Sequence, residues 1–173
     1  MSEAVRVVLV GMMGAGKSTI GAALSRATGW RYVDNDELVA GICGMPTRDV
    51  LDKRGVAAMR EAEFAAVDAV LAQPPPLVAG AAAGIVVNAA LCSRLHAGAF
   101  VVYLRARLDT LTARVAGTPR PWLGDDPAAA LHTLYTGREP LYEKLAHLIV
   151  DVDDAAPDDV AGAILEALEP PAA

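Results

Sequence analysis

The chain has 173 residues, of which 54% are hydrophobic and 21% are charged. This composition excludes an intrinsically disordered chain, and the length predicts one domain, residues 1–173, with a single hydrophobic core. The net charge is −6 at pH 7, which argues against a nucleic-acid partner because binding to phosphate backbones needs a basic face. A small anionic ligand stays possible, since a few local arginines suffice to bind one.

The sequence also argues against a membrane partner. It contains no run of roughly 18 apolar residues, the length that spans a bilayer. The apolar N-terminal segment is broken by glycines and by Lys17, so we interpret it as a strand rather than a signal peptide. Cys43 and Cys92 lack metal-ligand spacing, and two thiols in a chain of this size indicate a reducing compartment. We therefore expect a cytoplasmic protein, and we expect it to be a monomer.

Along the chain, short apolar segments alternate with segments of helical periodicity. The predicted strands are residues 5–10, 31–34, 77–81, 100–104 and 147–152. The predicted helices are residues 18–27, 36–41, 47–53, 56–71, 88–95, 108–115, 128–146 and 157–168. Such alternation is typical of βαβ units and predicts a parallel sheet with helices on both faces. Residues 117–127, with two glycines and three prolines, are predicted to form a loop.

The segment between the first strand and the first helix carries the strongest signal. Gly11, Gly14, Gly16, Lys17 and Ser18 match the pattern G-x-x-x-x-G-K-[ST], in the strand–loop–helix context that the motif requires. Such a loop curls its amides around phosphates at a helix N-terminus. Lys17 is expected to reach the β- and γ-phosphates and Ser18 to hold Mg²⁺, which predicts a site for ATP with Mg²⁺.

A pair of carboxylates follows the second predicted strand, in the segment "VDNDEL" at residues 33–38. Ligands of parallel sheets lie at the carboxyl ends of the strands, so Asp34 and Asp36 are expected beside the phosphate loop. One carboxylate would lie near Mg²⁺, and the other would take a hydrogen bond or a proton from an acceptor hydroxyl. A helix cap is the alternative interpretation, since Asp commonly precedes helices.

Five segments together resemble the shikimate kinase family in order and spacing. They are "GMMGAGKSTIG" at 11–21, "VDNDEL" at 33–38, "MREAE" at 59–63, "RPWL" at 120–123 and "REPLYEKLA" at 138–146. The resemblance covers nearly the whole chain. It implies phosphorylation of a hydroxyl of shikimate, a small carboxylated polyol, by ATP and Mg²⁺. It also implies a three-layer P-loop NTPase fold of the nucleoside-monophosphate-kinase type, with a five-stranded parallel sheet and a mobile lid at residues 117–127.

The resemblance further implies a role for individual residues. It gives Lys17, Asp34 and Arg120 catalytic roles, with Arg120 on the lid. Nucleotide binding is implied for Gly11, Gly14, Ala15, Gly16, Lys17, Ser18, Thr19 and Arg114, with Arg114 against the adenine. Ser18 and Asp34 are implied to hold the metal. Asp36, Arg60, Gly84 and Arg138 are implied to bind the acceptor, whose site lies mainly at residues 34–63.

Elementary chemistry agrees with the acceptor residues. An arginine presents a planar fork to a carboxylate, so Arg60 and Arg138 together would select an anionic acceptor. Glu63 lies three residues after Arg60 on the same predicted helix face and is expected to orient it.

One segment departs from the family. A Gly-Gly-Gly turn normally follows the third strand, and this chain has Ala82, Ala83 and Gly84 at those positions. The departure leaves two alternatives open. One is a related carbohydrate kinase, such as one for gluconate, and the other is a nucleotide-binding protein without turnover.

Overall fold

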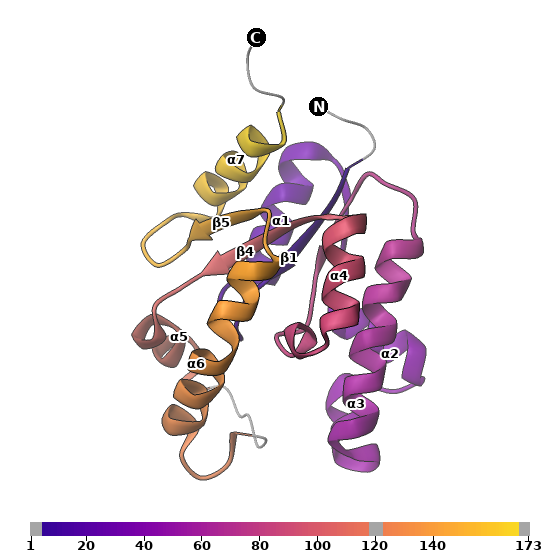
Figure 1. The fold of residues 1–173 in the computed structure, drawn as a ribbon, viewed down its shortest axis with the longest axis vertical. Coiled ribbons are helices and arrows are strands. Elements are labelled where there is room, and N and C mark those ends of the chain that lie inside the picture. Colours follow the sequence, from indigo (N-terminus) through magenta and orange to yellow (C-terminus); the bar gives the residue numbers. More distant parts are fainter. Residues whose placement is uncertain (1–4, 118–122, 170–173) are drawn as a thin grey trace.

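The fold is seen in a computed structural model, which describes residues 5–117 and 123–169. Five strands form one sheet: β1 (Arg6–Val10), β2 (Arg31–Val33), β3 (Leu77–Gly80), β4 (Phe100–Arg105) and β5 (Leu148–Asp151). Their order is β2-β3-β1-β4-β5, and every pair is parallel (Figure 1). The predicted fold class, a five-stranded parallel sheet of the P-loop kinase type, is confirmed.

Helices cover both faces of the sheet and give three layers (Figure 1). The described helices are α1 (Lys17–Thr28), α2 (Asn35–Cys43), α3 (Thr47–Ala72), α4 (Ala89–Gly98), α5 (Leu108–Val115), α6 (Pro127–Leu145) and α7 (Pro157–Leu168). Helices α1 and α7 contact each other on one face, while α3, α4 and α6 make contacts on the other. Helix α2 packs against α3 beyond the carboxyl end of β2.

The central strand explains the apolar run at the start of the sequence. Val7, Val8, Leu9 and Val10 of β1 are all buried, because β1 has a neighbouring strand on each side and helices above and below. The edge strand β5 differs: Leu148 and Val150 are half-buried, while Ile149 and Asp151 are exposed. The phosphate loop thus follows a central strand whose apolar side chains are buried in the core.

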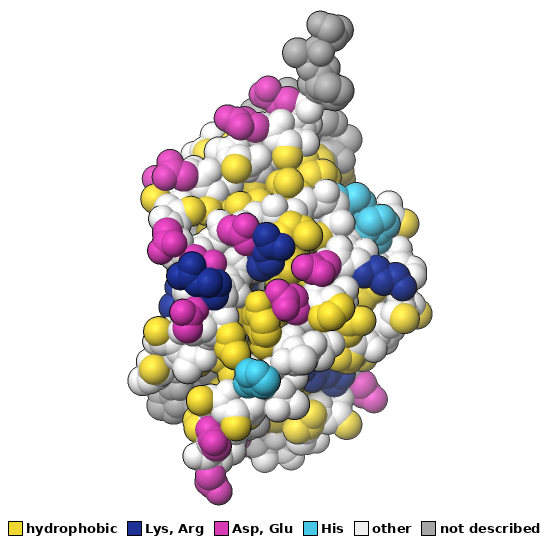
Figure 2. Space-filling view, turned by 60° about the vertical axis from the view of Figure 1, so that its left-hand side comes forward, with side chains coloured by type: hydrophobic (Ala, Val, Ile, Leu, Met, Phe, Trp, Pro, Cys, Tyr) yellow, Lys and Arg dark blue, Asp and Glu magenta, His cyan; other side chains and the backbone are white. Residues whose placement is uncertain are grey.

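The outer surface beside β5 carries charges of both signs. Figure 2 shows acidic and basic side chains interspersed among apolar ones on this side of the molecule. Arg105 pairs with Asp151 at 2.6 Å and with Glu143 at 3.8 Å. No helix within the described residues is long and apolar enough to cross a membrane.

The predicted helices 47–53 and 56–71 are both present, as two helical segments of α3 separated by a kink at Gly55, whose φ of 81° and ψ of 177° are not helical. A short 3₁₀ helix, η1 (Ile85–Val87), follows the turn after β3 and was not predicted. Residues 118–122 of the predicted lid, including Arg120, lie outside the described residues.

Candidate active site

The phosphate loop, residues 11–16, has a backbone that only glycines adopt readily. Gly14 and Gly16 have φ angles of 86° and 92°, in the left-handed region. Gly16 is also the N-cap of α1 and makes no side-chain cap. The amides at the start of α1 therefore face an anion that approaches the loop, and the helix dipole has the matching sign.

Two long side chains brace this loop. The ammonium of Lys17 donates to the carbonyl oxygens of Gly11 at 2.8 Å and Met12 at 3.0 Å. From α5, the Arg114 guanidinium donates to the carbonyl of Gly14 at 3.2 Å and to that of Val152 at 2.9 Å. Arg114 thereby ties the loop to the segment between β5 and α7. A hollow beside it is lined by Gly14, Ala15, Gly16, Ser18, Thr19, Ile20, Arg114, Val152, Ala155 and Pro157.

The Asp34 carboxylate is held by three donors at the carboxyl end of β2. Its Oδ1 accepts from the amide of Asp36 at 2.8 Å, which caps α2. Its Oδ2 accepts from the Ser18 hydroxyl at 3.0 Å and from the Tyr32 hydroxyl at 3.1 Å. Burial raises the pKa of Tyr32 well above its usual range, so this hydroxyl stays a donor. Asp34 therefore caps a helix with one oxygen and meets Ser18 with the other.

The oxygens of Ser18 and Asp34 fit Mg²⁺, a hard cation that prefers oxygen ligands. Mg²⁺ usually takes only one or two protein carboxylates and completes its shell with phosphates and water. Among residues 5–117 and 123–169, no group of three or more His, Cys, Asp or Glu side chains forms a metal cluster. The residues present thus suit a cation that arrives with the nucleotide phosphates.

A cleft of about 280 Å³ lies between the phosphate loop, Asp36 and the turn after β3. It is lined by Met13, Gly14, Lys17, Ser18, Tyr32, Asp34, Asn35, Asp36, Gly80, Ala81, Ala82 and Ala83. The Asp36 side chain is exposed at its rim, and its backbone carbonyl accepts from the Thr47 hydroxyl at 3.2 Å. Both Asp34 and Asp36 therefore lie beside the phosphate loop, as the strand ends predicted.

The guanidinium of Arg60, on α3, packs against Gly84 in the turn after β3. Its Nη1 is 2.8 Å from an oxygen of Glu63, one turn further along the same helix. A Cβ added at Gly84 would overlap the Arg60 guanidinium, so a side chain at this position would displace the end of Arg60. Burial raises the pKa of Glu63, and the charges of Arg60 and Arg138 oppose that shift. Arg60, Glu63 and Arg138 are thus close enough to interact, and the predicted Glu63 contact is present.

A buried tyrosine joins α6 to the same turn. The Tyr142 hydroxyl is 2.5 Å from the carbonyl oxygen of Ala83 and 3.8 Å from the sulfur of Met12. Burial raises the pKa of Tyr142, and the nearby Arg138 acts against that shift. One residue therefore contacts both the acceptor-side turn and the phosphate loop.

The alanines of the turn adopt ordinary backbone conformations. Among the described residues, none other than glycine has a positive φ. Ala82 and Ala83 are half-buried, and both line the cleft. Gly84 also has an ordinary φ of −86°. It is the position in the turn where an added methyl group would have to displace a neighbour, the guanidinium of Arg60.

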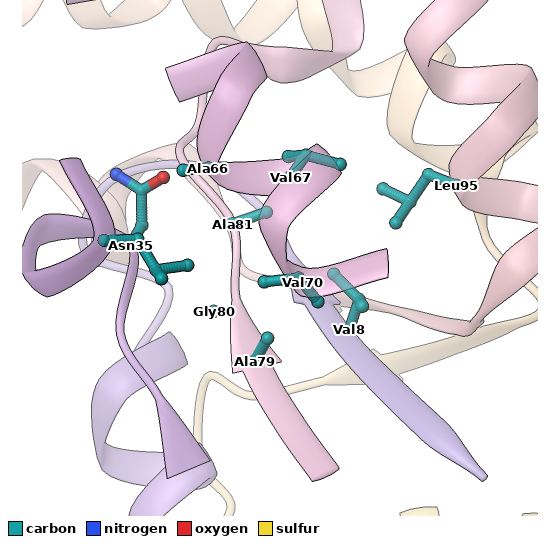
Figure 3. A pocket seen from close by; sticks show the side chains of 10 residues that line it. Val8, Asn35, Ala66, Val67, Val70, Ala79, Gly80, Ala81 and Leu95 are labelled. Atoms are coloured by element: carbon teal, nitrogen blue, oxygen red, sulfur yellow. The ribbon is translucent and has the colours of Figure 1, made fainter. Parts of the chain in front are cut away.

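A smaller cavity lies beneath the cleft, between β3 and α3 (Figure 3). Figure 3 shows Val8, Val67, Val70, Ala79 and Leu95 around it, with Asn35 at one side. Its volume is about 10 Å³, close to the minimum that one water molecule needs. This cavity is a packing gap, too small for a substrate.

Comparisons with known proteins agree with this geometry. The family model of shikimate kinase matches residues 13–169. A shikimate kinase of Psychrobacter arcticus is 36% identical over 170 residues, which are 97% of this chain and 91% of that protein. The chain belongs to the shikimate kinase family. A second relative, a shikimate kinase of Pseudomonas putida strain KT2440, is 37% identical over 165 residues. These residues are 94% of this chain and 95% of that protein.

Solved structures give the same family and fold. A shikimate kinase from Acinetobacter baumannii, in complex with shikimate, superposes with a TM-score of 0.89 at 28% identity. The match covers 96% of this chain and 94% of that one. A gluconokinase from Sinorhizobium meliloti has a TM-score of 0.58 at 18% identity, which shows the fold alone. Membership of the shikimate kinase family makes this chain a phosphotransferase.

The structure brings most predicted site residues of this family member together. Lys17, Ser18, Asp34 and Asp36 line one cleft, and Arg60 packs on Gly84 next to it. Two tyrosines of the site, Tyr32 and Tyr142, were not among the residues predicted from the sequence. Tyr32 lies two positions before Asp34 on a strand, so both side chains share a face, and this spacing could have revealed it. Tyr142 follows Arg138 by four residues on α6, which also puts the two on one face.

Proposed function

We propose that this protein transfers the γ-phosphoryl group of Mg²⁺-bound ATP to a hydroxyl of shikimate. The observation that carries the proposal is the pairing of Arg60 with Glu63 against Gly84, close to Arg138 and beside the phosphate-loop cleft. A carboxylated acceptor suits two guanidinium groups. The bound shikimate of the Acinetobacter baumannii relative supports this choice of acceptor.

On the nucleotide side, the amides of residues 11–16 would bind the phosphates, and Lys17 would move from the loop carbonyls to the β- and γ-phosphates. Ser18 and Asp34 would hold Mg²⁺, which neutralises charge on the phosphates when it is bound. Arg114 is exposed beside the hollow next to the loop, where the adenine would lie.

On the acceptor side, Arg60 and Arg138 would grip the carboxylate of shikimate, and Glu63 would keep Arg60 in place. Asp36 would accept the proton of the reacting hydroxyl. The acceptor oxygen then bonds to the γ-phosphorus as the bond to the β–γ bridging oxygen breaks, which releases ADP. Arg120, on the lid, would approach the transferring group and help to exclude water.

The test is a coupled assay of ADP release with Mg²⁺ and ATP, in parallel with shikimate, with gluconate and without acceptor. We expect release that depends on shikimate and on Mg²⁺. Release in the gluconate arm and in neither of the others would make gluconate the acceptor. Equal release in all three arms would mean ATP hydrolysis that needs no acceptor, and no release in any arm would leave a nucleotide-binding protein without turnover. Either result would overturn the proposal. We propose that the protein acts in the cytoplasm, where its free Cys43 and Cys92 stay reduced.

A further inference from the structure

Tyr32 is a polar residue of the cleft to which the mechanism above gives no role. Its hydroxyl lies 3.1 Å from Oδ2 of Asp34, the oxygen that also accepts from Ser18. A carboxylate oxygen can only accept, so the tyrosine donates. Tyr32 and Asp34 are two residues apart at the end of β2, which points both side chains to one face.

Two glycines make room for this side chain. A Cβ at Gly21, inside α1, would overlap the Tyr32 ring, and a Cβ at Gly80 of β3 would lie 2.8 Å from the Tyr32 hydroxyl oxygen. Neither glycine has a positive φ, and glycine is otherwise unfavourable inside helices and strands. Side chains are therefore missing at the two places where the ring and the hydroxyl of Tyr32 lie.

We infer that Tyr32 is a positioning residue for the metal-side oxygens. Its hydroxyl fixes Oδ2 of Asp34 toward Ser18, so that these two oxygens are already oriented when Mg²⁺ arrives with the nucleotide. Without this donor, the carboxylate keeps only the Ser18 bond on that oxygen and rotates more freely. Hydrogen bonds from outside the metal shell typically change metal affinity or activity by 10–100-fold. The inference rests on the proposed function in placing the cation at Ser18 and Asp34.

Tyr32→Phe is the direct test, since it removes the hydroxyl and leaves a ring that fits the same space. Tyr135→Phe is the matched control, because the Tyr135 hydroxyl also donates to a carboxylate, that of Glu139, at 2.7 Å within α6. The main readout is ADP binding by calorimetry over a range of Mg²⁺ or Mn²⁺ concentrations, which requires neither acceptor nor turnover. Steady-state KM values for acceptor and for Mg²⁺ form the second readout.

For Tyr32→Phe we expect about tenfold weaker metal binding to the ADP complex, with ADP affinity in metal-free buffer and the KM for acceptor unchanged. Tyr135→Phe should match the wild type. Gly80→Ala keeps the tyrosine and displaces only the far end of its side chain, so it should shift metal affinity in the same direction. In a variant that already carries Asp34→Asn, adding Tyr32→Phe should change metal affinity little further.

Metal affinity equal to that of the wild type in Tyr32→Phe would overturn the inference. So would a raised acceptor KM with unchanged metal dependence, because that pattern means that Tyr32 contacts the acceptor itself. A wild type that binds Mg²⁺ and ADP but phosphorylates no acceptor would refute the proposed function and leave this test intact.

Discussion

The phosphate loop and the turn after β3 line the same cleft, yet their shapes have different origins. The loop is shaped by its own residues: Gly14 and Gly16 have left-handed backbone, and Lys17 donates to two loop carbonyls. The turn at residues 82–84 has ordinary backbone. It is shaped by side chains from distant helices, with Arg60 of α3 against Gly84 and Tyr142 of α6 on the carbonyl of Ala83.

The two origins predict which changes each half should tolerate. On the proposed function, changes inside residues 11–18 should act on phosphate binding directly, because the amides of the loop would be the groups that bind the phosphates. Changes at the turn act through the placement of Arg60, Arg138 and Tyr142, so they should alter acceptor binding and leave nucleotide binding intact. Substitutions in each half would test this separation.

Lys17→Met should have the largest effect. On the proposed function, the variant loses the cation that would contact the transferring phosphates, as well as two hydrogen bonds that hold the loop. Loss of one preorganised charge-stabilising group typically lowers kcat by about 10²–10³. Steady-state kinetics should show this drop, while circular dichroism should show an unchanged fold. A kcat within tenfold of the wild type would contradict the assigned role of Lys17.

Gly84→Ala should weaken acceptor binding and spare the nucleotide. The added methyl displaces the Arg60 guanidinium, and a hydrogen bond to a charged group contributes about 1.5–3 kcal/mol. We therefore expect the KM for acceptor to rise about 10- to 150-fold, with ATP affinity by calorimetry unchanged. Gly162→Ala in α7 is the control, because nothing lies within 4 Å of the added Cβ. An unchanged KM in Gly84→Ala would mean that Arg60 does not bind the acceptor.

The two halves also differ in how far the sequence predicts them. The phosphate loop follows from contiguous residues, and the strands and helices follow from periodicity, so both were predicted closely. The contact of Arg60 with Gly84 joins residues that are far apart in the chain and lie on different elements, and neither a contiguous motif nor a periodicity encodes it. At Ala82 and Ala83, the residue types alone suggest a disturbed turn. The backbone angles are needed to see that neither position has the positive φ that favours glycine.

Tyr142→Phe should destabilise the turn. The hydroxyl of this buried side chain pairs with the carbonyl of Ala83, and an unpaired buried polar group costs about 1–3 kcal/mol. Chemical denaturation should show that loss in the free energy of unfolding. Acceptor KM should rise because the turn and Arg138 lose a fixed neighbour, whereas ATP affinity should hold. Weaker ATP binding in this variant would contradict the expectation that changes at the turn leave nucleotide binding intact.

Glu63→Gln should change the pH dependence of stability. Burial raises the pKa of Glu63 in the folded state above the ordinary value of 4.5, so its protonated form is the one that folding favours. Its stabilising contribution is complete below pH 4.5 and is lost as the pH rises through the raised pKa. The melting temperature should therefore decrease less steeply with rising pH above 4.5 in the variant than in the wild type. Parallel curves for variant and wild type would exclude Glu63 as a source of this dependence.

The smallest effect is expected for the double change Ala82→Gly and Ala83→Gly, which restores the glycine turn of the family. Neither alanine has a positive φ, so glycine relieves no strain there. It only adds freedom to the unfolded chain, which should lower the free energy of unfolding by about 0.4–1 kcal/mol per position. We expect kcat/KM for shikimate to change far less than in Gly84→Ala, since Arg60 and Tyr142 keep their contacts. If kcat/KM instead rises tenfold or more, the two methyl groups obstruct the acceptor, and the shape of the turn depends on its own residues as well as on the helices behind it.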